Sequence, residues 1–189
     1  MTLDYNYMAS DTKKISKKHQ AWFNSIENGD IETAKEMLAG SKKIAVDTER
    51  SDGRNALILA AGNSDHHMVK LLLDHGASVN FKNRMGRSPL SAIIAPDWGF
   101  QHKKSKEGSW EETVKLLLGR GAKPDQNTLY HLIQAWDSEV VEWFLKNCKS
   151  PIPMELISKT ISAAKPDHHE RQIDECSFKE NIRILLAAR

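Results

Sequence analysis

The sequence has little of what marks several common classes of protein. Two cysteines, Cys148 and Cys176, in 189 residues cannot form a disulfide framework, which favours a reducing environment. No stretch of about 18 consecutive apolar residues is present, so no membrane-spanning helix is expected. The first residues lack the apolar segment of a secretory signal. We therefore expect a cytoplasmic protein, and delivery into another cell stays open as an alternative.

The charges are close to balance, with 27 Lys and Arg against 25 Asp and Glu. A net charge of +2 does not favour binding of nucleic acid through bulk charge. We expect neither a nucleic-acid nor a membrane partner. Binding of nucleic acid through residues 82–106 and the lysines near the N-terminus is the alternative to test, through its dependence on salt.

The motifs of common active sites are also absent. There is no glycine-rich phosphate loop and no Gly-x-Ser-x-Gly elbow. One segment is rich in metal-ligating side chains: His168, His169, Glu170, Asp174 and Cys176. Its spacing fits no standard zinc pattern, and His66 and His67 would point about 100° apart on a helix. We predict no enzyme, no cofactor and no metal, with a metal-dependent enzyme using residues 168–176 as the alternative.

Two copies of one pattern recur along the chain. Residues 53–61 read GRNALILAA, and residues 86–94 read GRSPLSAII. Residues 69–77 (VKLLLDHGA) and 114–122 (VKLLLGRGA) also match but are further apart, so about 12 residues are inserted within the second copy. Each copy predicts a turn, a short helix with small residues, and a second helix that ends at a glycine such as Gly76. Asn80 and Gly53 are expected to shape the turns.

Weaker copies flank these two. Helix pairs are expected at residues 22–29 and 30–38, at 128–135 and 138–145, and at 153–164 and 178–188, with Ser138 as an N-cap and Pro153 as a first helical residue. The predicted organisation is an N-terminal tail (1–17) followed by units 18–48, 49–81, 82–125, 126–150 and 151–189. Insertions are expected at residues 95–110 and 165–177.

These motifs resemble the ankyrin-repeat family. The family pattern Gly-x-Thr-Pro-Leu-His-x-Ala-Ala corresponds to residues 53–61 and 86–94, and Val-x-x-Leu-Leu-x-x-Gly-Ala to residues 69–77 and 114–122. The chain departs from it at Thr-Pro-Leu-His, where it has NALI and SPLS. The resemblance implies an all-α solenoid of stacked helix-turn-helix units with hairpin-like turns, and a non-catalytic protein–protein interaction module.

The resemblance also implies where a partner would bind, namely at the turn tips and at the inner face of the first helices. Carried over residue by residue, the exposed turn positions that we predict to bind a partner are Glu49, Asp52, Arg54, Lys82, Arg84, Met85 and Arg87. Turn tips are usually charged because they are exposed to water, so the alternative is an ordinary solvated surface that binds no partner.

The inserted segment 95–110 adds further candidates. Large aromatic side chains beside basic groups are typical anchors of an interface, so we predict that it also binds the partner, through Trp98, Phe100, His102, Lys103, Lys104 and Trp110. Between residues 82 and 108 six Lys and Arg stand against two acidic residues, which indicates an acidic partner surface. The alternative is that Trp98 and Trp110 pack on the core. Segment 165–177 either forms a composite site with it or is independent.

The function expected from these patterns is a stand-alone binder or inhibitor of one protein partner, monomeric when free, for example a toxin-neutralising immunity protein. A secreted effector or an adaptor that captures a cellular or host protein is the alternative within the same class.

Overall fold

A computed structural model describes residues 16–39, 44–95, 110–136, 138–164 and 175–187. These residues form helices and connecting turns, with one isolated bridge between Glu49 and Asn55. The helices are α1 (Lys17–Asn28), α2 (Ile31–Ala39), α3 (Ala56–Gly62), α4 (His66–Asp74), α5 (Pro89–Ile94), α6 (Trp110–Gly119), α7 (Gln126–Ala135), α8 (Ser138–Asn147), α9 (Met154–Ala163) and α10 (Glu175–Ala187).

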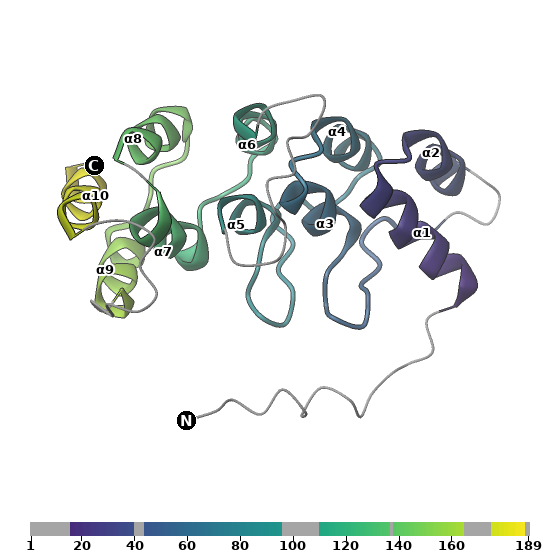
Figure 1. Cartoon of the computed structure of the whole chain (residues 1–189), viewed down its shortest axis with the longest axis horizontal. Helices are drawn as coiled ribbons and strands as arrows, with labels where there is room; N and C mark the ends of the chain where they lie inside the picture. Colours follow the sequence, from purple (N-terminus) through teal and green to yellow (C-terminus); the bar gives the residue numbers. More distant parts are fainter. Residues whose placement is uncertain (1–15, 40–43, 96–109, 137, 165–174, 188–189) are drawn as a thin grey trace.

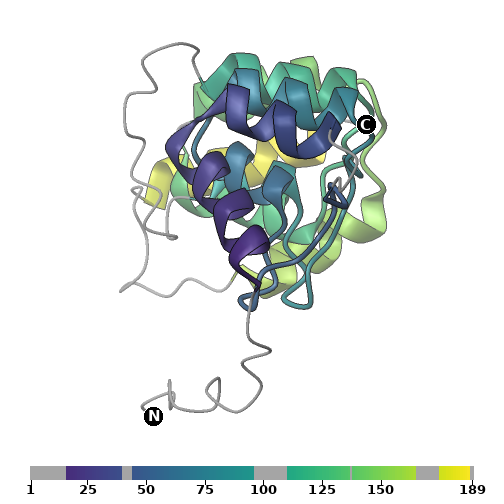
Figure 2. The same cartoon turned by 90° about the vertical axis from the view of Figure 1, so that its right-hand side faces the viewer.

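The helices lie in two rows that run along the molecule from α1 to α10 (Figure 1). One row contains α2, α4, α6 and α8, and the other contains α1, α3, α5, α7 and α9; Figure 2 looks along the stack and shows the two rows as layers. Neighbours within a row pack together, as α1 does with α3, α3 with α5, α5 with α7 and α7 with α9. This arrangement confirms the all-α solenoid of stacked helix-turn-helix units.

The core runs without a break from α1 to α10. It begins at Trp22, which is fully buried, and continues through Leu72, Leu117 and Phe144 to Leu185. Every residue of α3 and of α5 is buried. The small side chains in α3, predicted from the sequence to allow a close approach, explain how these two helices come so near each other.

Polar side chains cap the first helices where the family's Thr and His are missing. Asn55 accepts a hydrogen bond from the backbone N–H of Ile58 at the start of α3 (2.9 Å). At the start of α5, Ser88 accepts from the N–H of Ser91 while the hydroxyl of Ser91 accepts from the N–H of Ser88. Both devices satisfy N–H groups that have no partner within the helix.

Helix ends follow the predicted glycine pattern. Gly76 has φ 85°, a left-handed conformation that costs a glycine little. Its N–H donates to the carbonyl of Leu73, and the next N–H, of Ala77, donates to that of Leu72. Two expected helix starts differ from the structure by one position: Ser138 is the first residue of α8, and Pro153, with φ −61° and ψ 135°, is the extended residue before α9. Proline suits either place because its fixed φ fits both conformations.

Side chains from one turn bind the next unit. Asp47 accepts hydrogen bonds from the N–H and the hydroxyl of Ser78 (3.2 and 2.6 Å). Asn80, at the equivalent place in the following unit, donates to the carbonyl of Gly121 (2.9 Å) and accepts from the N–H of Lys123 (2.8 Å). Asn80 therefore joins two units, whereas the sequence led us to expect a role within its own turn.

Candidate protein-binding surface

The turn before α3 is closed by its own backbone. The N–H of Arg50 donates to the carbonyl of Arg54 and the N–H of Gly53 to that of Arg50, both at 2.8 Å. Gly53 has φ 77°, which few other residues adopt without strain. This geometry places Asp52 at the tip between two arginines.

An ion network fixes that tip. The Oδ2 atom of Asp52 lies 2.6 Å from guanidinium nitrogens of both Arg50 and Arg54, and Arg50 also binds Glu27 of α1. Burial alone would raise the pKa of Asp52, but hydrogen bonds from Arg50 and Arg54 outweigh it and lower this pKa to about 2. The arginines therefore hold this turn together and attach it to α1.

We expect Asp52→Asn to lower the free energy of unfolding near neutral pH by about 1 kcal/mol, a value discounted because 35% of the Asp52 side chain is exposed. The folded-state pKa is depressed, so the stabilisation is present above the unfolded value of 3.8 and is lost as the pH falls toward about 2. Urea unfolding of both proteins from pH 6 to pH 2 measures the difference. Two curves that stay equally far apart at pH 2 would contradict the ion network.

The turn before α5 repeats this geometry in the next unit. The N–H of Asn83 donates to the carbonyl of Arg87 (3.0 Å), and the N–H of Gly86 to that of Asn83 (2.8 Å). In place of a carboxylate, the side-chain oxygen of Asn83 accepts from the N–H groups of Met85 and Arg87 (3.0 and 2.9 Å). The neutral, buried side-chain amide of Asn83 thus shapes this second turn. The turn contains three cations, Lys82, Arg84 and Arg87, and no acidic residue.

The predicted turn residues fall into two groups. Glu49, Lys82, Arg84 and Met85 are exposed, Met85 at 46%. Three positions that the sequence led us to expect as exposed are only partly so: Asp52, Arg54 and Arg87. For Asp52 and Arg54 the reason is the ion network, in which each is the other's partner. Binding of a partner by these residues stays a prediction.

Trp110 belongs to an aromatic cluster. Its ring centroid lies 5.0 Å from those of Trp136 and of Trp143. The indole N–H of Trp136 donates to the carbonyl of Ile94 at the end of α5 (2.8 Å), and the ammonium of Lys115 lies over Trp143. Trp110 is partly buried there, which favours the alternative of packing on the core. The other predicted residues of the insertion lie outside the described residues: Trp98, Phe100, His102, Lys103 and Lys104.

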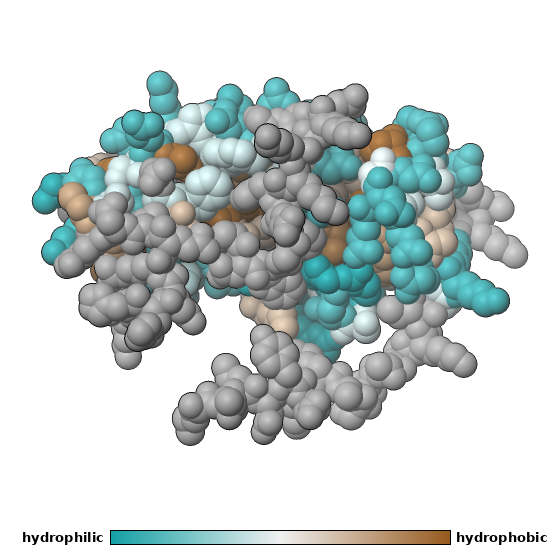
Figure 3. Space-filling view, in the orientation of Figure 1, coloured by the Kyte–Doolittle hydropathy of each residue, from teal (hydrophilic) through white to brown (hydrophobic). Residues whose placement is uncertain are grey.

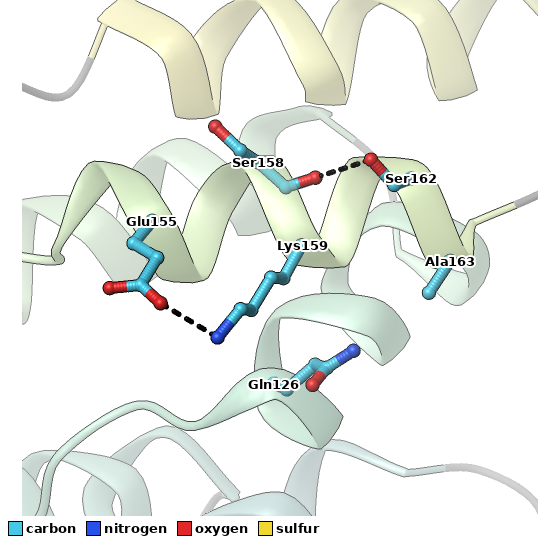
Figure 4. Close-up of a pocket in the computed structure, with 6 residues that line it drawn as sticks. All are labelled: Gln126, Glu155, Ser158, Lys159, Ser162 and Ala163. Carbon is cyan, nitrogen blue, oxygen red and sulfur yellow. Dashed lines mark hydrogen bonds and ion pairs between the residues drawn. The ribbon is translucent and has the colours of Figure 1, made fainter.

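The inner helices contribute unequally to the exposed surface. Because all residues of α3 and α5 are buried, these two helices offer none of the inner-face positions that the resemblance implied. Further along, a shallow depression of about 670 Å³ lies between the start of α7 and α9 (Figure 4). It is lined by Gln126, Glu155, Ser158, Lys159, Ser162 and Ala163. Its charges are already paired, Lys159 with Glu155 at 2.7 Å.

Nothing in the described residues indicates catalysis. Within them no group of three or more His, Cys, Asp and Glu is placed to hold a metal, and residues 168–174 of the histidine-rich segment lie outside this part. The Cys148 thiol donates to the carbonyl of Ser150, and burial raises its pKa, so it stays protonated. No helix in the described part of the chain has the length and apolar character needed to cross a membrane.

Residues 22–99 match the sequence model of a family described as ankyrin repeats, in three copies. This part of the chain belongs to the ankyrin-repeat family. Ankyrin repeats are a protein–protein interaction scaffold, so the repeats indicate an interaction module. The matched span contains both turns described above, the second half of α1, and the helices α2, α3, α4 and α5.

Similar proteins include two whose names combine ankyrin repeats with other domains. "Ankyrin repeat, SAM and basic leucine zipper domain-containing protein 1" of Mus musculus is 28% identical over 65% of this chain and 25% of its own length. The protein of the same name from Carollia perspicillata is 31% identical over 58% of this chain and 21% of its own. This chain thus spans about a quarter or less of these relatives. A solved ankyrin repeat domain from Acinetobacter baumannii AYE is 17% identical, covers 88% of this chain and 96% of that one, and has a TM-score of 0.39.

Two structural residues of the surface were missed in the sequence. Arg50 and Asn83 occupy equivalent places in the two turns and organise them. The repeat spacing could have indicated both. It could not have indicated that Arg50 binds Glu27, because that contact joins different units.

Proposed function

We propose that this chain is a binder or inhibitor of one protein partner, which it contacts along the turn edge of the repeat stack, formed by residues 49–54 and 82–87. The observation that supports this most is the pair of rigid turns before α3 and α5. They are held by their own hydrogen bonds and present exposed charged and apolar side chains. A surface that is already ordered loses little entropy when a partner binds.

A partner with an acidic surface fits this edge best. The turn before α5 carries Lys82, Arg84 and Arg87 and no carboxylate. Complementary charge speeds association and selects the partner. Inhibition, as by an immunity protein that covers an enzyme's active site, is one outcome of such binding; capture by an effector or assembly by an adaptor is the other.

The test is affinity capture from native lysate with the intact chain as bait. Arg84→Glu reverses an exposed charge at the turn edge, and Lys146→Glu makes the same change at an exposed position of α8, in the other row. A third bait lacks residues 97–108. We expect one stoichiometric partner, identified by mass spectrometry, that is reduced about tenfold with Arg84→Glu and unchanged with Lys146→Glu.

The results of these captures distinguish the possible binding sites and the possible roles of the protein. A partner lost only with the deletion would move the binding site to the inserted segment. Capture of no protein by any bait would contradict a binder that acts in its own cell and would favour an effector.

A further inference from the structure

The turn of residues 82–87 is anchored to the units on both sides. Toward α3, the guanidinium of Arg84 donates to the carbonyl of Ser51 at the tip of the preceding turn. Toward α7, the side-chain amide of Asn127 donates to the carbonyl of Gly86 (3.1 Å). The ammonium of Lys82 also lies 3.6 Å from Asp125, the N-cap of α7. The tip between these anchors is therefore fixed in position.

This fixed tip exposes an apolar side chain beside a cation. Met85 is the most exposed of the large hydrophobic side chains in the part of the chain that the structure describes, at 46%. Its neighbour Arg84 is exposed, and the group it binds is a neutral carbonyl, so its charge is not compensated there. In Figure 3, the part of the surface near the turns that is not drawn in grey is mostly hydrophilic.

We propose that this turn is the binding site for an acidic segment of the partner protein. In that complex a carboxylate of the segment contacts the guanidinium of Arg84, and an apolar side chain contacts Met85. This rests on the proposed function and adds the chemistry of the partner. Guanidinium binds carboxylate through paired N–H donors, and the flexible methionine side chain adapts to the apolar group beside it. A nucleic acid would satisfy Arg84 through a phosphate but would leave Met85 in contact with charged backbone.

The test measures fluorescence anisotropy of labelled peptides with the full chain. The probe is a short peptide of alternating glutamate and leucine, and its counterpart has glutamine in place of glutamate. We expect the glutamine peptide to bind about tenfold more weakly, and binding to weaken as salt rises. Arg84→Glu should weaken binding of the acidic peptide about tenfold and Met85→Ala about fivefold, while Lys146→Glu changes it less than twofold.

Equal binding of the two peptides would overturn the proposal, as would an affinity that neither Arg84→Glu nor Met85→Ala changes. Tighter binding of a labelled DNA duplex than of the acidic peptide would also overturn it. Because Arg84 helps to anchor its turn, Met85→Ala keeps the test independent of that anchor. A protein partner still captured by Arg84→Glu and Met85→Ala would refute this binding site and its place on the turn edge, while binding of a partner by another surface of the chain would stand.

Discussion

Replacing Trp22 with alanine is expected to lower the free energy of unfolding by about 3–5 kcal/mol. Trp22 has no exposed surface and lies in the core of the first unit beside Phe23 and Ile26. The loss combines the transfer of a large apolar side chain to water with a cavity that its neighbours fill only in part. Urea unfolding followed by circular dichroism gives the difference.

Trp22→Phe is the matched control and should cost less than about 1.5 kcal/mol. Among the described residues the buried indole N–H of Trp22 has no hydrogen-bond partner, so phenylalanine removes a polar group that contributes no bond there. If Trp22→Phe were as destabilising as Trp22→Ala, the indole N–H would have a partner outside this set.

This first unit also matters for the turn edge. α1 packs against α3 and carries Glu27, which holds Arg50 in the turn before α3. In a repeat stack each unit is stabilised mainly by its neighbours. Loss of Trp22 should therefore loosen the turn before α3 more than the turn before α5, which is anchored to α7 through Asn127.

The period of the repeat made most of the fold predictable. The helix pairs and the turn glycines follow local patterns: periodic apolar residues and residues suited to a positive φ. Asn55 and Ser88 could be read as caps for the same reason, since a cap bonds within three residues.

The exposure of the candidate site could not be predicted in the same way. In the sequence Asp52 and Arg54 look like solvent-exposed turn residues. In the structure they belong to an ion network that includes Arg50 and Glu27 and spans two units. Trp110 looks like an anchor for a partner, yet Trp136 and Trp143, from the next unit, pack against it. In each case a contact between units decides the exposure, and the period within a unit carries no information about it.

Replacing Asn181 with alanine is expected to destabilise the C-terminal end by about 1–3 kcal/mol. Asn181 of α10 is fully buried, and its amide donates to the carbonyl of Trp136 at 2.7 Å and, at 3.4 Å, to those of Leu132 and Ile133. These carbonyls end α7 and have no donor within the helix. Alanine would leave them buried without this donor.

The loss of stability should be confined to the C-terminal end of the stack and to the adjoining cluster of Trp110, Trp136 and Trp143. Hydrogen exchange followed by mass spectrometry should show faster exchange in α10 and no change in α3 and α4, because distant units of a stack are coupled only through the units between them. Trp136 is held by Asn181 through its carbonyl and by Ile94 through its indole, so tryptophan fluorescence should also shift. Arg183→Ala, at an exposed position of α10, is the control and should change stability by less than about 0.5 kcal/mol. Equal exchange in α10 of the Asn181→Ala variant and the parent chain would mean that apolar contacts alone, such as those of Phe178 and Leu185, hold this helix on the stack.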